Sequence, residues 1–230
     1  MSRPFRRRPA RSVLTRRHRQ YNGPTPVPDR GAVAGDGLPG KEGMGPMRGG
    51  GGTDYARPVS GGKLLLTGPP GCGKTTVARR SARILGSRAT GFFTEEVRDA
   101  TGSRSGFRVE STDGKLGELS SRRSGPGPRV GAYVVDVAAF ESVALPSLAG
   151  DREHVYIIDE IGKMECFSSA FRRRVREILD SGVRVLATIP ARGGGPFLSE
   201  IRNRTDVAIV SVTRENRDRL PAEISAAFRS

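Results

Sequence analysis

Short apolar runs alternate with amphipathic segments from residue 61 to the end of the chain. The run KLLLT at 63–67 predicts a buried strand, and TVARRSARILG after it predicts a helix that Gly86 ends. Further strands are predicted where apolar residues cluster again, over 154–160, 183–189 and 206–212. Helices are predicted between and after these strands, over 167–182, 196–204 and 215–230.

Residues 89–121 have a different pattern, in which short runs are separated by turns that contain glycine. The runs GFFTEEVR, GFRVES and LGELS predict an antiparallel hairpin or meander, inserted after the first helix. RVGAYVVD, at 129–136, predicts one more strand, and Asp136 is placed to cap a helix that extends to about Leu148.

The repeated strand–helix order predicts an α/β fold. A near-continuous apolar strand such as 183–189 is typical of a parallel sheet that is covered on both faces. We therefore expect a three-layer sandwich, in which helices cover a mostly parallel sheet and the meander is an antiparallel insertion.

Composition divides the chain near residue 60. Residues 1–60 carry a net charge of +8, 11 of the 31 glycines and 8 of the 16 prolines, with little apolar periodicity. Such a segment cannot bury enough apolar surface to offset the entropy that is lost on ordering. We expect a disordered basic tail over 1–60 and one folded domain over 61–230.

Three explanations of this tail stay open. A basic arm would bind nucleic acid or an anionic membrane. A transit segment would account for the eight arginines and the lack of acidic residues in 1–20. The third explanation is a GC-rich genome, with a true start at Met44 or Met47. The intact mass of the native protein tests this last explanation, because a full-length mass contradicts a late start.

The whole chain has 230 residues and a net charge of +15, which by itself suggests nucleic-acid binding. No run of 18 apolar residues and no secretory signal occurs in the sequence. Cys72 and Cys166 are too few for a disulfide scaffold, and His18 and His154 form no zinc motif. We expect a cytoplasmic protein without membrane association, or an organellar one if residues 1–20 are a transit segment.

A glycine-rich phosphate-binding motif (P-loop, Walker A) follows the first predicted strand. GPPGCGKT matches G-x-x-x-x-G-K-[ST], because Gly68, Gly73, Lys74 and Thr75 occupy the defined positions. The glycines let backbone N–H groups point at phosphate oxygens, and the next helix presents its positive dipole end. Lys74 would contact the β- and γ-phosphates, and Thr75 would be a ligand of Mg²⁺. The predicted nucleotide-binding residues are Gly68, Pro69, Pro70, Gly71, Cys72, Gly73, Lys74, Thr75 and Thr76.

An acidic pair ends the strand that is predicted at 154–160. VYIIDE places Asp159 and Glu160 at the carboxyl end of that strand, where open α/β sheets bind ligands. In this Walker B pattern, Asp159 is predicted to hold Mg²⁺ together with Thr75, and Glu160 to act as the general base. Mg²⁺ is therefore the expected cofactor, and Lys74 and Glu160 are the expected catalytic residues.

Phosphoryl transfer also needs positive charge near the γ-phosphate in the transition state. The chain has 34 arginines, so the sequence selects none of them. The candidates are two arginines of the meander, one lysine after the acidic pair and two later arginines: Arg98, Arg104, Lys163, Arg192 and Arg204.

Several motifs occur in an order that resembles a known family. They are GPPGCGKTT, GFFTEEVR, RVGAYVVD, IIDEIGKME, FLSEIRNR and VTRENRD, and over about 62–225 the chain resembles the THEP-type nucleoside-triphosphatases. The resemblance implies a RecA/Ras-like P-loop NTPase fold and Mg²⁺-dependent hydrolysis of several nucleoside triphosphates, with slower action on diphosphates. It also implies a second nucleotide-binding segment made of Val155, Tyr156, Ile157, Ile158, Asp159, Glu160, Ile161 and Gly162.

The leading hypothesis is an enzyme that hydrolyses ATP, GTP, CTP and UTP to diphosphate and phosphate. The sequence contains no N-K-x-D motif that would read guanine. One alternative is a nucleotide or nucleoside kinase, in which the arginine-bearing meander closes over the substrates. Another is a nucleic-acid-associated protein that uses ATP as a switch. The expected partners are nucleoside triphosphates. Nucleic acid is not required as a partner and would bind only through the tail, and we expect a monomer.

Overall fold

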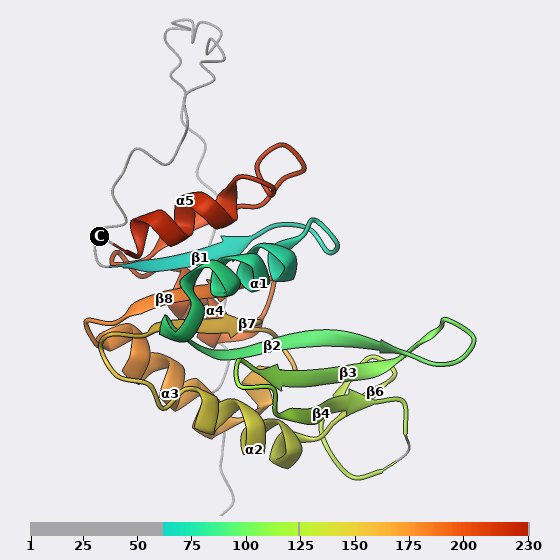
Figure 1. The fold of residues 1–230 in the computed structure, drawn as a ribbon. Helices are drawn as coiled ribbons and strands as arrows, with labels where there is room; N and C mark the ends of the chain where they lie inside the picture. The colour runs from blue at the N-terminus through green and yellow to red at the C-terminus, as the bar shows by residue number, and fades with distance from the viewer. Residues whose placement is uncertain (1–61, 124, 230) are drawn as a thin grey trace, which may run out of the picture. The chain divides into compact units, whose positions relative to one another are not determined.

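The computed structural model describes residues 62–123 and 125–229, and the strands of this part form one mixed sheet (Figure 1). The described part contains nine strands, which lie in the order β5-β6-β4-β3-β2-β7-β8-β1-β9. Their bounds are β1 Lys63–Thr67, β2 Ala89–Arg98, β3 Arg104–Ser111, β4 Leu116–Ser121, β5 Arg129–Val130, β6 Tyr133–Val135, β7 Val155–Asp159, β8 Arg184–Thr188 and β9 Ala208–Ser211. The predicted tail and its boundary after residue 60 lie outside these ranges and stay predictions.

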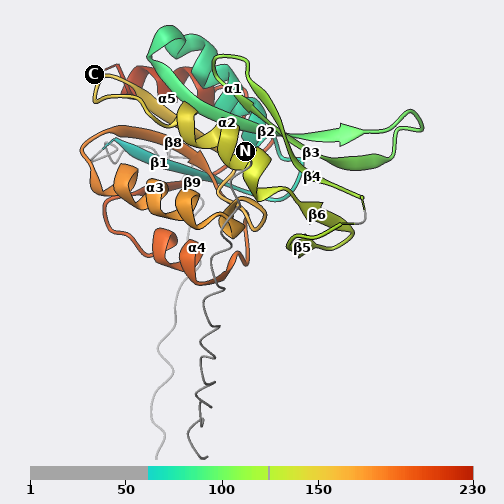
Figure 2. The ribbon, with the colours of Figure 1, turned by 90° about the horizontal axis from the view of Figure 1, so that it is seen from below.

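Helices cover both faces of this sheet. Within the described ranges they are α1 Lys74–Leu85, α2 Val137–Ser147, α3 Ser169–Asp180, α4 Gly195–Arg202 and α5 Leu220–Ala227, with 3₁₀ turns η1 Gly86–Arg88 and η2 Glu165–Phe167. Figures 1 and 2 show α1 and α5 together on one face and α3 and α4 on the other. None of the helices in the described part has the length and apolar character needed to cross a membrane. The three-layer α/β arrangement is the one that the sequence predicts.

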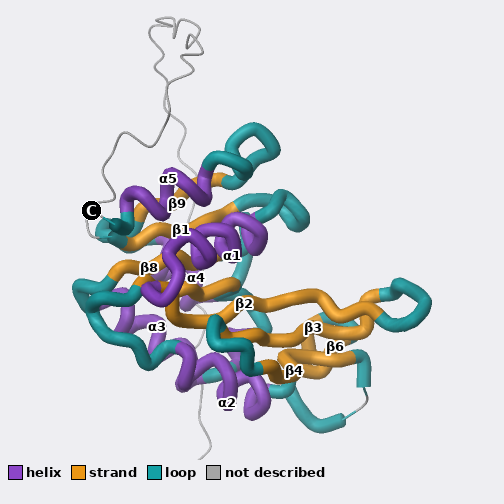
Figure 3. Tube along the Cα trace, viewed as in Figure 1, coloured by secondary structure: helices purple, strands orange, loops and turns teal. Residues whose placement is uncertain are grey.

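The sheet has a parallel and an antiparallel half. Strands β2, β7, β8, β1 and β9 are parallel neighbours, and β3, β4, β6 and β5 continue the sheet in antiparallel fashion. β2 belongs to both halves, because its first residues pair with β7 and its later residues pair with β3. The predicted meander is therefore an extension of the main sheet, and Figure 3 shows its long β2–β3 hairpin extending beyond the other strands.

Alternate residues of the central strands fill two cores. In β1, Leu65 faces the core that includes α2, α3 and α4, whereas Leu64 and Leu66 face the core that includes α1 and α5. In β7, Ile158 faces the first of these cores and Ile157 faces the second. Each such buried side chain contributes about 2 kcal/mol to folding. Because both faces are buried, these strands need continuous apolar runs, which is why the sequence predicts them well.

One predicted strand is a hairpin instead. Residues 129–136 contain β5 and β6, which are joined by a tight turn that places Arg129 opposite Val134. The turn passes through Gly131 with a φ of 59°, a left-handed conformation that favours glycine. The prediction of the next helix is confirmed, since Asp136 accepts a hydrogen bond from the Ala139 N–H at 2.9 Å.

The last helix is shorter than the sequence predicts. It begins at Leu220 and not near residue 215. The Asn216 side chain accepts from the Thr213 N–H and donates to the Ser211 carbonyl, at 2.8 Å in each case. An asparagine that bonds neighbouring backbone groups in this way favours a turn over a helix.

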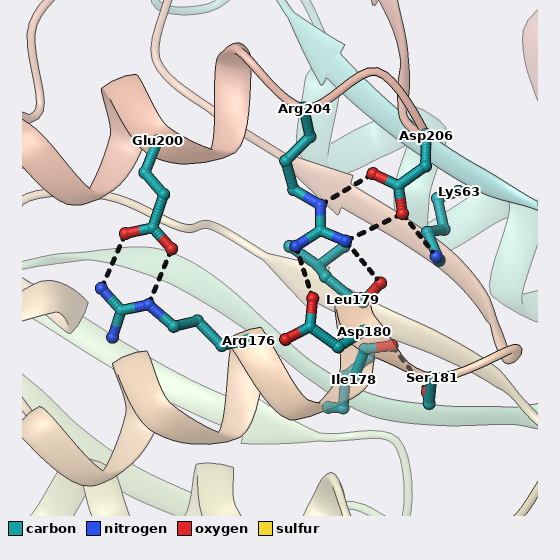
Figure 4. Close-up of polar contacts among 9 residues, drawn as sticks. All are labelled: Lys63, Arg176, Ile178, Leu179, Asp180, Ser181, Glu200, Arg204 and Asp206. Atoms are coloured by element: carbon teal, nitrogen blue, oxygen red, sulfur yellow. Dashed lines mark hydrogen bonds and ion pairs between the residues drawn. The ribbon is translucent and has the colours of Figure 1, made fainter.

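A charged network anchors the loop between α4 and β9 (Figure 4). Arg204, a sequence candidate for the γ-phosphate, donates to Asp180 at 2.6 Å and to Asp206 at 2.8 Å. The Lys63 ammonium donates to the same Asp206 at 2.7 Å. Arg204 therefore joins α3 to the loop that precedes β9, and it has a structural role.

We expect Asp206→Asn to lower the free energy of unfolding by about 1–3 kcal/mol, because the Lys63 side chain, only 8% exposed, loses its counter-charge. Urea unfolding at pH 7 measures the loss. Glu200→Gln is the matched control, since the Arg176–Glu200 pair is 45% and 44% exposed and should contribute less than about 1 kcal/mol. Equal losses in the two variants would contradict this account.

The same network predicts a pH dependence. Arg204, and then Lys63, hold the pKa of Asp206 well below its usual range, so the ionised carboxylate favours the folded state. This contribution is complete above about pH 5 and is lost as the pH falls below the pKa of the unfolded chain, about 3.9. Asp206→Asn and wild type should therefore differ less at pH 3 than at pH 7 in thermal unfolding. A difference that does not shrink in acid would show that the network is not the cause.

Candidate active site

The phosphate-binding motif forms the turn between β1 and α1. Gly73 has a φ of 110°, a left-handed conformation that favours glycine. At Gly68, a Cβ would lie 2.7 Å from Cys72 Sγ and 2.9 Å from the Val212 carbonyl oxygen. The loop therefore needs glycine at both positions to curl closely against the end of β9.

The start of α1 is open to an anion. Within the described residues no side chain caps this end of α1, and its first turn holds no acidic residue. Its first backbone N–H groups and its positive dipole end are thus available to a phosphate. Lys74 turns back over the loop, and its Nζ donates to the Gly68 carbonyl at 3.1 Å.

Asp159 ends β7 and is fully buried. The Thr188 hydroxyl, at the end of the neighbouring β8, donates to Oδ1 of Asp159 at 2.7 Å. Oδ2 is buried too, and no described residue is its hydrogen-bond partner. Burial raises the pKa of Asp159, and the hydroxyls of Thr188 and Thr75 oppose this rise. The structure thus brings Thr75 and Asp159, the two predicted ligands of Mg²⁺, to one place.

Glu160 follows at the same edge of the sheet and is half-buried. Burial raises its pKa, the positive charge of Lys74 opposes the rise, and the charge of Asp159 adds to it. The loop lysine and the acidic pair therefore lie within electrostatic reach of each other. A cation, a carboxylate ligand and a base at one edge are the groups that phosphoryl transfer to water requires.

The remaining residues of the predicted second segment pack behind this edge. Their side chains are buried in the two cores, Tyr156, Ile158 and Ile161 in one, Val155 and Ile157 in the other. The Ile161 N–H donates to the Thr188 carbonyl at 2.8 Å, which ties the chain after Glu160 to β8. These side chains position the acidic pair by packing.

A buried carboxyl group that the sequence does not single out lies beside Glu160. Glu165, in η2, is 5% exposed. A Cβ on Gly162 would lie 2.7 Å from Oε2 of Glu165 and 3.3 Å from Oε1 of Glu160, so both carboxyl groups adjoin this glycine. Burial raises the pKa of Glu165 to about 8, and the charges of Glu160 and Asp159 add to the rise. Near neutral pH, Glu165 is therefore mostly a protonated acid.

The basic candidates of the meander are held within it. Arg98 and Arg104 both pair with Glu96 on the β2–β3 hairpin, and Arg98 also donates to the Gly102 carbonyl at 2.7 Å. Lys163 is exposed, as is Arg192, the remaining candidate. In the described part of the chain, no contact joins any of these basic groups to the phosphate-binding loop.

Arg79 is the basic residue that links α1 to the meander. Its guanidinium lies 2.7 Å from Glu110 and 3.8 Å from Glu95, and it covers the Phe93 ring at 4.5 Å from the ring centre. Its charge also opposes the rise in the pKa of Asp159 that burial causes. Arg79 therefore positions α1 and the phosphate-binding loop against the edge of the sheet where Asp159 and Glu160 lie.

The sequence pattern does not identify Thr188, Glu165 or Arg79 as residues of this site. Thr188 does leave a signal in the sequence, because it is a polar residue within the apolar end of the strand predicted at 183–189. Glu165 and Arg79 left none, since their positions depend on contacts with residues of other elements.

Residues 63–225 of this chain match the model of a protein family that is described as NTPase. The chain is 47% identical over 165 residues to the nucleoside-triphosphatase THEP1 of Aquifex aeolicus, a match that covers 68% of this chain and 93% of that protein. It is 44% identical over 184 residues to a cancer-related nucleoside-triphosphatase of Homo sapiens. That match covers 73% of this chain and 96% of the human protein.

A solved structure supports the same likeness. The crystal structure of THEP1 from the hyperthermophile Aquifex aeolicus is similar with a TM-score of 0.68 and 43% sequence identity, over 73% of this chain and 99% of that one. The described residues thus have the P-loop NTPase type of α/β fold that the sequence predicts.

We expect Glu165→Gln to flatten the pH dependence of stability. The pKa of Glu165 is about 8 in the folded protein and about 4.3 in an unfolded chain, so folding favours the protonated form. This contribution is complete below about pH 4 and is lost as the pH rises toward 8. Between pH 5 and pH 8, wild type should lose about 2–4 kcal/mol that the variant keeps, measured by urea unfolding.

Glu177→Gln is the control for that experiment, because Glu177 lies on α3 with its side chain 51% exposed. It should follow the wild-type curve. If the curve of Glu165→Gln also runs parallel to wild type, the buried acid at residue 165 does not titrate in this range.

Proposed function

We propose that this chain, which belongs to the NTPase family, binds nucleoside triphosphates together with Mg²⁺ and hydrolyses them to diphosphate and phosphate. Nucleoside-triphosphate phosphohydrolase activity in general follows from the family and from relatives that carry that name. The metal, the breadth of bases and the residue roles are our proposal. The observation that carries it is the convergence of Lys74, Thr75, Asp159 and Glu160 at one edge of the sheet.

The loop would hold the phosphates. The N–H groups at the uncapped start of α1 donate to phosphate oxygens, and the helix dipole adds to the attraction. Lys74, whose Nζ donates to the Gly68 carbonyl, would supply positive charge to the β- and γ-phosphates.

Asp159 and Thr75 fit a magnesium ion. They offer the hard oxygen donors that this ion prefers, and Oδ2 of Asp159 is buried without a described partner. When bound, Mg²⁺ would supply positive charge that offsets the negative charge of the phosphates. Thr188 keeps the Asp159 carboxylate oriented through its hydrogen bond to Oδ1.

Glu160 would take the proton of the attacking water. The water oxygen forms a bond to the γ-phosphorus, the bond from that phosphorus to the β–γ bridging oxygen breaks, and the proton passes to the Glu160 carboxylate. The nearby Lys74 charge favours the ionised carboxylate that this step needs. Diphosphates lack the γ-phosphate that Glu160 would address, so we expect them to react more slowly.

The breadth of bases has support in the relatives. Their names specify nucleoside triphosphates and no particular base. The groups that converge at the edge are those that act on phosphates, which every nucleoside triphosphate shares.

Lys74→Ala should weaken ATP binding at least about 100-fold and abolish turnover, because the loop loses its positive charge. Glu160→Gln should bind ATP within about threefold of wild type but hydrolyse it at least about 100-fold more slowly, because the amide cannot accept a proton. Calorimetry and phosphate release measure the two effects. Lys115→Ala, at an exposed turn of the meander, is the control for loss of a lysine. Normal hydrolysis by Glu160→Gln would show that the base is another residue.

A steady-state assay with ATP, GTP, CTP and UTP, with and without Mg²⁺, tests the substrate class. We expect phosphate release from all four with kcat/KM values within about tenfold, and loss of release without the metal. Candidate nucleosides and RNA are added in parallel. Transfer of phosphate to a nucleoside would favour a kinase, and strong stimulation by RNA would favour a nucleic-acid-associated switch.

A further inference from the structure

Arg217 lies against the phosphate-binding loop. It belongs to residues 212–219, which connect β9 to α5. A Cβ on Gly73 would lie 3.3 Å from Cδ of Arg217 and 3.9 Å from its Cβ. The aliphatic part of Arg217 therefore covers the last residue before α1. The guanidinium group begins one bond beyond Cδ, and none of its atoms lies within 4 Å of that Cβ position, so the charged end extends past Gly73.

The backbone around Arg217 is held by several contacts. Its own N–H donates to the Thr213 carbonyl at 3.1 Å, and the Asn216 side chain closes the turn before it. The next residue, Asp218, pairs with Arg80 on α1 at 3.1 Å. The position of Arg217 over the loop is thus set by its neighbours in the chain and does not need its charged end.

The guanidinium of Arg217 is uncommitted. The residue is exposed, and within 62–123 and 125–229 its side chain makes no hydrogen bond, ion pair or ring contact. Arg176 and Arg204 differ, since each is paired with a carboxylate. An unpaired arginine whose stem is fixed against a nucleotide loop has its charged plane available to a ligand.

The strand order decides which part of a nucleotide reaches Arg217. Asp159 and Thr188 end β7 and β8 on one side of β1, whereas β9 lies on the other side. If the proposed function holds, the γ-phosphate lies with Glu160 on the first side. The loop after β1 holds the phosphate chain between the two sides, so the nucleoside extends toward β9 and Arg217.

We propose that the guanidinium of Arg217 stacks on the face of the bound nucleobase. This inference rests on the proposed function, because it takes the orientation of the nucleotide from it. Arginine is suited to the role, since its planar cation stacks on aromatic faces. Every base has such a face, so stacking adds affinity without base selectivity. Arg217 would therefore help the site to accept all four nucleoside triphosphates.

The test compares wild type, Arg217→Ala, Arg217→Lys and the control Arg83→Ala in the full chain. Arg83 is an exposed arginine in the last turn of α1, at the end opposite the loop. Dissociation constants are measured by calorimetry for ATP, GTP, CTP, UTP and inorganic tripolyphosphate with Mg²⁺, and kcat and KM by phosphate release. Circular dichroism verifies that each variant is folded.

Arg217→Ala should raise Kd and KM about tenfold for ATP and GTP, and somewhat less for CTP and UTP, whose rings are smaller. Its kcat should stay within about twofold, because the stack acts equally on bound substrate and transition state. Tripolyphosphate binding should not change, since it has no base. Arg217→Lys should resemble the alanine variant, and Arg83→Ala should resemble wild type.

Three results would overturn the stacking proposal. One is unchanged nucleotide affinity in Arg217→Ala. Another is an equal loss for tripolyphosphate, which would place the guanidinium on a phosphate. The third is normal affinity in Arg217→Lys, which would show that charge suffices. Failure of the proposed function would look different: wild type would bind nucleotides without releasing phosphate, and the binding measurements would still decide the role of Arg217.

Discussion

The hydrogen bond from the Thr188 hydroxyl to Asp159 is the contact on which the site depends. It joins the ends of β7 and β8 in a fully buried position and fixes one oxygen of the Asp159 carboxylate, so that the other oxygen has no described partner. A buried negative charge without a close counter-ion is unfavourable, and burial accordingly raises the pKa of Asp159. We propose that a bound cation stabilises the ionised Asp159 carboxylate, so that metal binding and the ionisation of Asp159 are coupled.

The two cores explain how that edge meets the phosphate-binding loop. Alternate residues of β1 and β7 are buried on opposite faces, which fixes both strands with their carboxyl ends at one edge. The loop then curls against the end of β9, because Gly68 allows the Val212 carbonyl to approach closely. The result is a loop with Asp159 and Glu160, the residues proposed for hydrolysis, on its β7–β8 side and Arg217 on its β9 side. This placement of the acidic residues and Arg217 on opposite sides of the loop is consistent with a site that acts on phosphates and has little base selectivity.

Much of this arrangement could be predicted from the sequence, because the central strands are continuous apolar runs that end in motifs. The bounds of β1 and the presence of Asp159 at the end of β7 follow from KLLLT and VYIIDE. The hairpin at 129–136 could not be predicted by its apolar pattern, since the turn at Gly131 decides it. Glu165 and Arg217 could not be assigned either. Glu165 is singled out by its burial beside Gly162, and Arg217 by the packing of its aliphatic part against Gly73. Both contacts join residues of different elements, so the sequence pattern does not reveal them.

The coupling between the buried Asp159 and the metal is the central claim, and the Mg²⁺ dependence of ATP affinity tests it most directly. Calorimetric titrations of wild type and Asp159→Asn with ATP, with Mg²⁺ and with a chelator, give the four dissociation constants. We expect Mg²⁺ to tighten ATP binding at least about tenfold in wild type and less than about twofold in Asp159→Asn. An equal gain from Mg²⁺ in both proteins would contradict the account, because the metal would then be held without the Asp159 carboxylate.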